Sequence, residues 1–113
     1  MKIMIFIEGT TFYTRFPIFL FSKYGYKPIS NAVEIINDWH KQGYEIYLCS
    51  YVRKSRYNFI KQIIDFYGMK YTEILCREKG EQYSEIVERI KPGILIEDDC
   101  KSIGVRRNGA LLM

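Results

Sequence analysis

Residues 2–10 read KIMIFIEGT, in which an unbroken apolar run from Ile3 to Ile7 is followed by Glu8 and Gly9. The run has the length of a β-strand, and because no polar residue alternates with the apolar ones, both faces of the strand are expected to be buried. Strands of this kind occur in parallel sheets whose two faces are covered by helices. This stretch therefore predicts an α/β fold.

The rest of the chain alternates between strand and helix patterns. Further strands are expected at 44–49, 71–76 and 94–96, and helices at 31–43, 53–67 and 82–91. Asn31 and Glu34 have the spacing of a capping box at the start of the first helix. Alternating strands and helices favour right-handed crossovers, which predicts a three-layer, doubly wound, Rossmann-like sandwich with a mainly parallel sheet.

Length and composition predict a single domain that spans residues 1–113, because 48% of its 113 residues are hydrophobic and can fill one core. The net charge of +4 is compatible with anionic ligands but is too small to predict nucleic acid as a partner. Cys49, Cys76 and Cys100 form no CxxC pair and are odd in number, which favours reduced thiols and a cytoplasmic location. No apolar run is long enough to span a bilayer, so no membrane association is expected.

Polar residues follow each expected strand, and the carboxyl ends of parallel strands are where such sheets bind ligands. These residues are Glu8, Ser50, Lys79, Asp98 and Asp99. Carboxylates are ligands that Mg²⁺ prefers, while a lysine and a hydroxyl can hold the oxygens of a phosphate group. The set therefore predicts a metal and phosphate site, although loops after strands are often polar without any function.

The stretch IMIFIEGTTF resembles the first motif of the haloacid dehalogenase superfamily, which is an apolar strand followed by Asp-x-Asp-Gly-Thr. Gly9 and Thr10 match this motif, and Glu8 approximates its second aspartate. The remaining motifs follow in order, from the first strand to Gly104. The resemblance implies a small, minimally capped domain related to Mg²⁺-dependent phosphatases, with a small phosphorylated molecule as its substrate.

The later motifs imply roles for four residues. Ser50, at the end of YEIYLCS, resembles the phosphate-binding hydroxyl of the second motif, and Lys79 suits the third. ILIEDD resembles the fourth motif, which gives Asp98 and Asp99 the role of magnesium ligands together with Glu8. Thr10 joins Ser50 and Lys79 as a phosphate-binding residue through its match to the first motif.

The first motif departs from the family pattern at Phe6, which occupies the position of the nucleophilic aspartate. A phenyl ring cannot form an aspartyl-phosphate, so the covalent route of the family is not expected. Glu8 can instead act as a general acid or base that directs water at a phosphoester. Arg53, three residues after Ser50, either clamps an anionic group of the substrate or lies solvated at a helix start.

Two stretches stand outside these motifs. Residues 10–28, which Pro17, Gly25 and Pro28 interrupt, predict a loop with a short helix in the place of a cap. The aromatic residues of the segment 12–26 line a substrate pocket, fill the core or, as we favour, pair two copies into a homodimer. The tail 105–113 lacks the pattern of a further strand and helix, and one hypothesis is that a frame shift near Gly104 truncated it.

Two other functions remain open. Glu8 with Glu97 and Asp99 also resembles the Toprim arrangement of metal-dependent topoisomerases and nucleases, which gives no role to Ser50 or Lys79. Alternatively, the chain is a non-catalytic module that binds a protein or a small anion through its aromatic segment and the basic residues of the helix expected at 53–67. Whether the protein is an enzyme therefore stays open at this point.

Overall fold

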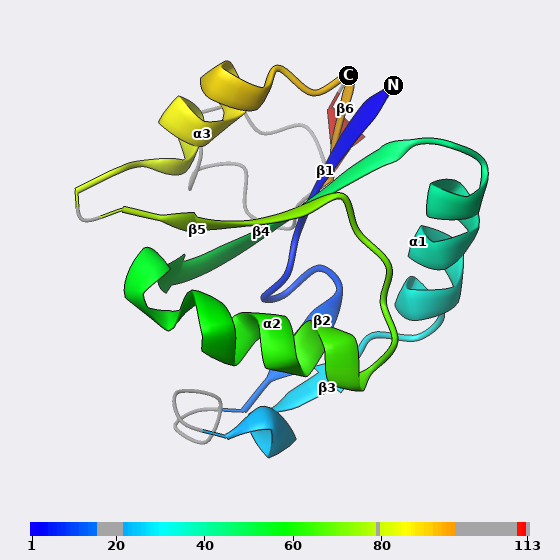
Figure 1. Ribbon diagram of the computed structural model, residues 1–113, viewed down its shortest axis with the longest axis vertical. Helices are drawn as coiled ribbons and strands as arrows, with labels where there is room; N and C mark the ends of the chain where they lie inside the picture. The colour runs from blue at the N-terminus through cyan, green and yellow to red at the C-terminus, as the bar shows by residue number, and fades with distance from the viewer. Residues whose placement is uncertain (16–21, 79, 97–110, 113) are drawn as a thin grey trace.

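The computed structural model describes residues 1–15, 22–78, 80–96, 111 and 112 (Figure 1). The strands are β1 (Lys2–Phe6), β2 (Phe12–Thr14), β3 (Tyr26–Pro28), β4 (Glu45–Arg53), β5 (Glu73–Arg77), β6 (Ile94–Ile96) and β7 (Leu111–Leu112). The α-helices are α1 (Ala32–Lys41), α2 (Tyr57–Phe66) and α3 (Tyr83–Ile90), and short 3-10 helices span Lys23–Gly25 and Lys54–Arg56. None of the described helices has the length and apolarity that crossing a bilayer requires.

The main sheet has the strand order β5-β4-β1-β6-β7. β1 pairs in parallel with both β4 and β6, and β4 pairs in parallel with β5. Only β7 runs antiparallel, beside β6. The prediction of a mainly parallel α/β sheet is confirmed, and β1 occupies the interior position that its uninterrupted apolar sequence requires.

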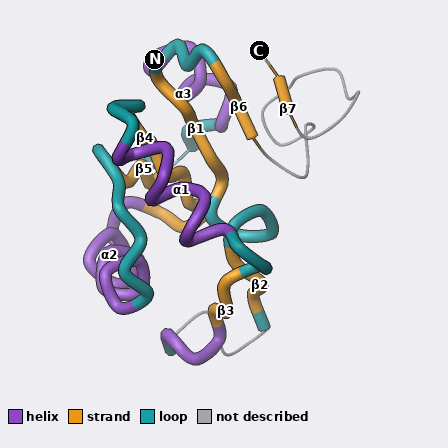
Figure 2. The backbone as a smooth tube through the Cα atoms, turned by 90° about the vertical axis from the view of Figure 1, so that its right-hand side faces the viewer, coloured by secondary structure: helices purple, strands orange, loops and turns teal. Residues whose placement is uncertain are grey.

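Helices cover both faces of this sheet (Figure 2). Ile3 and Ile5 of β1 point to the face covered by α1 and α2 and belong to the larger core cluster. Met4 and Phe6 point to the opposite face, where they pack with Ile86 of α3. Successive side chains of a strand alternate between faces, so one strand contributes to both cores. The three-layer, Rossmann-like arrangement is therefore confirmed.

The expected helix at 53–67 begins later than predicted. β4 continues through Arg53 with a register shift between Ser50 and Arg53, and α2 begins only at Tyr57 after the 3-10 helix. Val52 is buried in the core, which favours the extended backbone over an earlier helix start. Arg53 is therefore a strand-end residue, not a helical one.

The predicted capping box at Asn31 is also wrong, because the Asn31 side chain makes no capping hydrogen bond. Its φ of −99° and ψ of 23° depart from the extended backbone that a capping side chain needs. Gln82 has this extended backbone, with φ of −101° and ψ of 157°, and forms a capping box with Glu85 at α3. Both sequences have the spacing of a capping box, and the backbone conformation of the cap residue determines which of them forms it.

Residues 10–28 contain a β-hairpin, which the prediction of a loop with a short helix missed. β2 and β3 pair antiparallel and lie beyond the carboxyl end of β1 (Figure 1). Phe12 and Tyr26 are buried, whereas Tyr13 and Tyr24 are exposed. Phe12 and Tyr26 are thus core residues, which is one of the three roles considered for the segment 12–26, while a homodimer contact through its other aromatic residues stays a prediction.

The expectation that no further strand follows residue 104 is wrong as well. Leu111–Leu112 forms β7 and pairs with Leu95 and Ile96 of β6. A strand of two residues is too short to produce a recognisable alternation in the sequence, so its pairing could not be predicted. The rest of the tail lies outside the described residues.

Candidate functional site at the ends of β1 and β4

A tight turn directly after β1 holds Glu8 at the carboxyl edge of the sheet. The backbone N–H groups of Thr11 and Phe12 both donate to the carbonyl oxygen of Ile7, at 3.1 and 3.0 Å. Gly9 has a φ of +84°, a conformation that glycine adopts without strain. The chain therefore reverses within a few residues and keeps the Glu8 side chain close to the strand end.

The carboxylate of Glu8 accepts two hydrogen bonds from hydroxyl groups on other elements. Ser50 Oγ of β4 lies 2.6 Å from Glu8 Oε2, and Tyr26 OH of β3 lies 2.9 Å from the same oxygen. Hydroxyl donors at these distances form strong bonds with an ionised carboxylate. The contact joins the carboxyl end of β1 to Ser50 and to the hairpin. Ser50 was expected just after a strand but lies inside β4, which continues through Arg53.

Ser50 and Tyr26 are themselves held in place. Ser50 is fully buried, and its hydroxyl accepts a hydrogen bond from the backbone N–H of Val52 at 3.2 Å. The Tyr26 ring packs edge-on against Phe12, and its carbonyl oxygen accepts a bond from Tyr67 OH at 2.6 Å. The geometry around Glu8 is thus fixed by packing before any ligand binds.

Sequence reasoning identified Glu8 and Ser50 but missed Tyr26. The structure brings the first two into direct contact, across 42 positions of the sequence. Tyr26 follows Gly25 in a stretch that we expected to be a loop, and its role depends on the pairing of β2 with β3. An aromatic residue next to a glycine carries no signal for such a contact.

Phe6 is part of the core and not of this polar group. It is 6% exposed and packs on the α3 face with Cys49, Leu75 and Ile86. Its position opposite Cys49 in the β1–β4 register leaves it enclosed by apolar side chains. The residue that replaces the family's nucleophile therefore contributes packing.

Thr10 and Thr11 differ sharply in their hydrogen bonds. The Thr11 hydroxyl donates to the carbonyl oxygen of Ile7 at 3.0 Å and also reaches that of Phe6 at 3.4 Å. Thr10 Oγ1 is buried and is the one such side-chain oxygen without a partner in the described part of the chain. Thr10 lines a cavity of about 150 Å³ beneath α1, together with Ile36 and other apolar residues.

The other predicted site residues are placed as follows. Arg53 is exposed at the end of β4, opposite Arg77 of β5, in a solvated position at the same edge of the sheet as Ser50. Lys79, Asp98 and Asp99 lie outside the described residues. Across residues 1–15, 22–78, 80–96 and 111–112, no three His, Cys, Asp or Glu side chains gather to hold a metal ion.

The negative charge of Glu8 affects the pKa of two buried thiols, those of Cys76 and Cys49. Desolvation by burial raises the pKa of Cys76 to about 11, and the negative charge of Glu8 adds to this effect. The pKa of Cys49 is also raised, first by burial and then by Glu8. Both thiols are therefore protonated and unreactive in the folded protein, as expected for small residues inside apolar strands.

Comparison with known proteins shows the fold. No protein-family model and no curated protein matches the chain. A chain in a structure of the Pnkp1/Rnl/Hen1 RNA repair complex superposes with a TM-score of 0.74 and 16% identity over 90% of this chain. A chain in a second Pnkp1/Rnl/Hen1 structure gives a TM-score of 0.73, again at 16% identity and 90% coverage. The present chain spans 37% and 40% of those two chains.

At this level of identity the likeness defines a class by fold alone. The chain is an α/β protein with a Rossmann-like sandwich, and the superposition includes nearly all of it.

Replacing Thr11 and replacing Thr10 are expected to change the free energy of unfolding differently. Thr11→Val removes a bonded hydroxyl and is expected to lower the free energy of unfolding by about 1 kcal/mol. Thr10→Val removes a buried hydroxyl that lacks a partner, so it is expected to be neutral or to stabilise by up to about 1 kcal/mol. Urea unfolding of the two isosteric variants side by side measures the difference, and equal losses would contradict it.

The raised pKa of Cys76 and of Cys49 predicts that both thiols are alkylated slowly in the folded protein. With a pKa of about 11, Cys76 is a thiolate in only about one thousandth of molecules at pH 8, so native Cys49 and Cys76 should react at least about a hundredfold more slowly than in urea. Mass spectrometry measures how fast iodoacetamide modifies a Cys100→Ser variant, in which Cys49 and Cys76 are the two remaining thiols. Because the folded pKa is raised, stability should fall as the pH rises from 9 towards 11. Equal rates in buffer and urea would contradict the assignment.

Proposed function

We propose that this chain is a haloacid-dehalogenase-like domain that binds a phosphorylated molecule at the carboxyl ends of β1 and β4 and hydrolyses its phosphoester with water. The observation that carries the proposal is the 2.6 Å hydrogen bond between Ser50 Oγ and Glu8 Oε2. It joins the residues that correspond to the first and second motifs of that superfamily. These residues are far apart in the sequence, so their contact is independent support for the resemblance.

The sheet order adds to this support. β1 and β4, which carry the two motifs, are hydrogen-bonded neighbours, and Phe6 lies opposite Cys49 just before the strands deliver Glu8 and Ser50. Ligands in open parallel sheets bind beyond the carboxyl ends of the strands. Both motifs therefore open onto the edge where a ligand is expected.

In the proposed reaction Glu8 acts as general base. Its carboxylate takes a proton from a water molecule as the water oxygen forms a bond to phosphorus and the bond from phosphorus to the ester oxygen breaks. The protonated Glu8 then gives its proton to the leaving oxygen, so that an alcohol and inorganic phosphate are released. Ser50 can redirect its hydroxyl from Glu8 to a phosphate oxygen during this step.

Three further residues have proposed supporting roles. Arg53, exposed at the end of β4, supplies a guanidinium group that can bind an anionic part of the substrate. Thr10 and Lys79 keep the phosphate-binding roles that the resemblance implies. Because Phe6 has no carboxylate, the proposed reaction passes through no covalent aspartyl-phosphate at this position.

Magnesium remains a proposal. Glu8 is the one carboxylate of the expected set that lies in the described part of the chain, and Asp98 and Asp99 would complete the ligands. Oxygen donors of this kind suit Mg²⁺, which would supply positive charge beside the phosphate oxygens.

The substrate is proposed to be a small phosphomonoester. The two structures compared above are of Pnkp1/Rnl/Hen1 complexes, one of them described as an RNA repair complex, so a phosphorylated RNA is a second class of substrate to test. The Toprim-like alternative gives no role to Ser50, whose buried hydroxyl contacts Glu8. This contact favours the phosphatase-like proposal over it.

The proposal predicts that Glu8→Gln lowers Mg²⁺-dependent hydrolysis of a generic phosphomonoester at least about a hundredfold, because a general base is lost. Ser50→Ala should lower it by about tenfold or more, since a hydrogen bond to a charged group is lost. Glu34→Gln on the exposed surface of α1 is the matched control and should retain full activity. Release of phosphate is measured for the phosphomonoester and for a phosphorylated oligoribonucleotide.

Two results would overturn this function. Hydrolysis that survives Glu8→Gln would place the chemistry elsewhere, and a native protein inert towards both substrates would favour a binding module. Asp98→Asn tests the magnesium proposal separately, because removing a carboxylate ligand should lower the Mg²⁺-dependent hydrolysis and raise the Mg²⁺ concentration that it needs. Phe6→Asp tests whether a nucleophile restores turnover, and its burial predicts a loss of about 3 kcal/mol or more in stability.

A further inference from the structure

β5 forms one edge of the main sheet. Within the described residues its one strand neighbour is β4, and the opposite side of its backbone pairs with no strand. Edge strands can pair with another chain unless charges, bulges or a covering element prevent it. Glu73 and Arg77 stand at the two ends of β5, and apolar residues and a cysteine lie between them.

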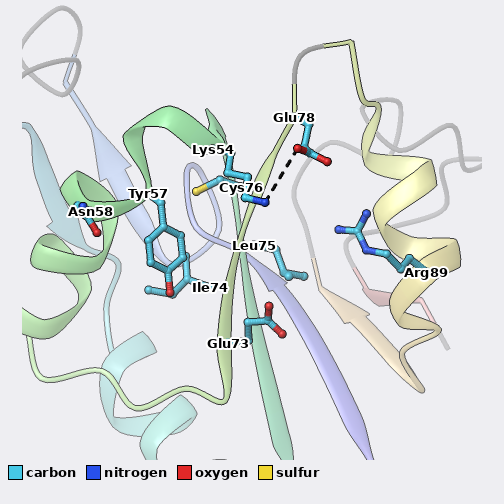
Figure 3. Close-up of a pocket in the computed structure, with 9 residues that line it drawn as sticks. All are labelled: Lys54, Tyr57, Asn58, Glu73, Ile74, Leu75, Cys76, Glu78 and Arg89. Atoms are coloured by element: carbon cyan, nitrogen blue, oxygen red, sulfur yellow. Dashed lines mark ion pairs between the residues drawn. The ribbon is translucent and has the colours of Figure 1, made fainter.

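A groove of about 640 Å³ runs along this edge (Figure 3). Leu75 and Cys76 form part of its floor, Tyr57 of α2 lines one side, and Arg89 of α3 lines the other. In the close-up, Glu73 and Glu78 lie at opposite ends of the groove with Leu75 between them. The groove therefore runs along β5, whose central side chains are buried and whose end residue Glu73 is exposed.

The charged residues at the two ends of β5 are complementary when two copies of the strand pair in antiparallel orientation. In an antiparallel pair centred on Leu75, Glu73 of one copy lies opposite Arg77 of the other, and the same pair recurs at the other end. A parallel pair would instead place Glu73 opposite Glu73 and Arg77 opposite Arg77. Opposite charges stabilise a cross-strand pair and like charges destabilise it, so the charges select the antiparallel arrangement.

We propose that two copies of this chain associate through β5, antiparallel and two-fold symmetric about Leu75. Each copy uses the same surface, as a two-fold interface requires. The backbone groups on the open edge of β5 bond to the second copy, and the two five-stranded sheets become one continuous sheet. The occupant of the groove is thus the β5 strand of the second copy.

The charge distribution around β5 favours this occupant. Arg77 lies opposite Arg53 of β4 in the strand register, so two arginines belong to that end of the strand pair. Glu73 of the second copy would bring a carboxylate to it. Glu73 is exposed, so it can reach a partner without unfolding any part of the chain. This interface does not involve the aromatic segment 12–26, and it does not depend on the proposed hydrolase function.

Charge reversal tests the proposal. Glu73→Arg and Arg77→Glu each place like charges opposite one another at both ends of the strand pair, so each should weaken self-association at least about tenfold. An equimolar mixture of the two variants pairs arginine with glutamate at both ends and should form a heterodimer. The double variant E73R/R77E should dimerise as the native protein does.

Sedimentation equilibrium over a range of protein concentrations measures all of these species. Glu34→Arg on α1 is a matched surface control and should leave the native dimer unchanged. Circular dichroism confirms that each variant is folded, and higher salt should weaken the native dimer. A native protein that stays monomeric, single variants that still dimerise, or a mixture that fails to associate would each overturn the proposal.

Discussion

The interior position of β1 is the constraint on which the rest of the structure depends. A strand that is apolar on both faces has to bury its backbone as well, and buried N–H and C=O groups need partners. β4 and β6 supply them on the two sides of β1, and helices cover both faces. Because parallel strands end at the same edge, this requirement also brings the ends of β1 and β4 together. The contact between Glu8 and Ser50 follows from it.

Glu8 lies half-buried at that edge, where a carboxylate loses part of its hydration. The hydroxyls of Ser50 and Tyr26 replace that hydration with two directed hydrogen bonds to one oxygen. The same negative charge raises the pKa of Cys76 and of Cys49. Two hydroxyl donors hold the carboxylate in one orientation at the strand end, which suits the role proposed for it as a general base.

The elements that the sequence predicts well are those whose signal is local. Uninterrupted apolar runs predicted β1 and β6. Glu8 and Ser50 were predicted as site residues because they are the first polar residues after apolar runs. The elements missed depend on contacts made elsewhere in the chain. β4 extends to Arg53 because β5 and the core hold it, and Tyr26 reaches Glu8 because of the hairpin. Such contacts leave no periodicity in the sequence, so only the folded chain reveals them.

The site and the open edge are connected through β4. Ser50 lies opposite Cys76 of β5, and the register between these strands shifts directly after that pair, before Arg53 lies opposite Arg77. A shift of this kind bends a strand and redirects the side chains that follow it. The positions of Ser50 and Arg53 therefore depend on how firmly β5 holds the end of β4. A strand added to the outer edge of β5 would restrain that end of β4 further. The pairing of β4 with β5 would therefore affect both the association of two copies and the positions of Ser50 and Arg53.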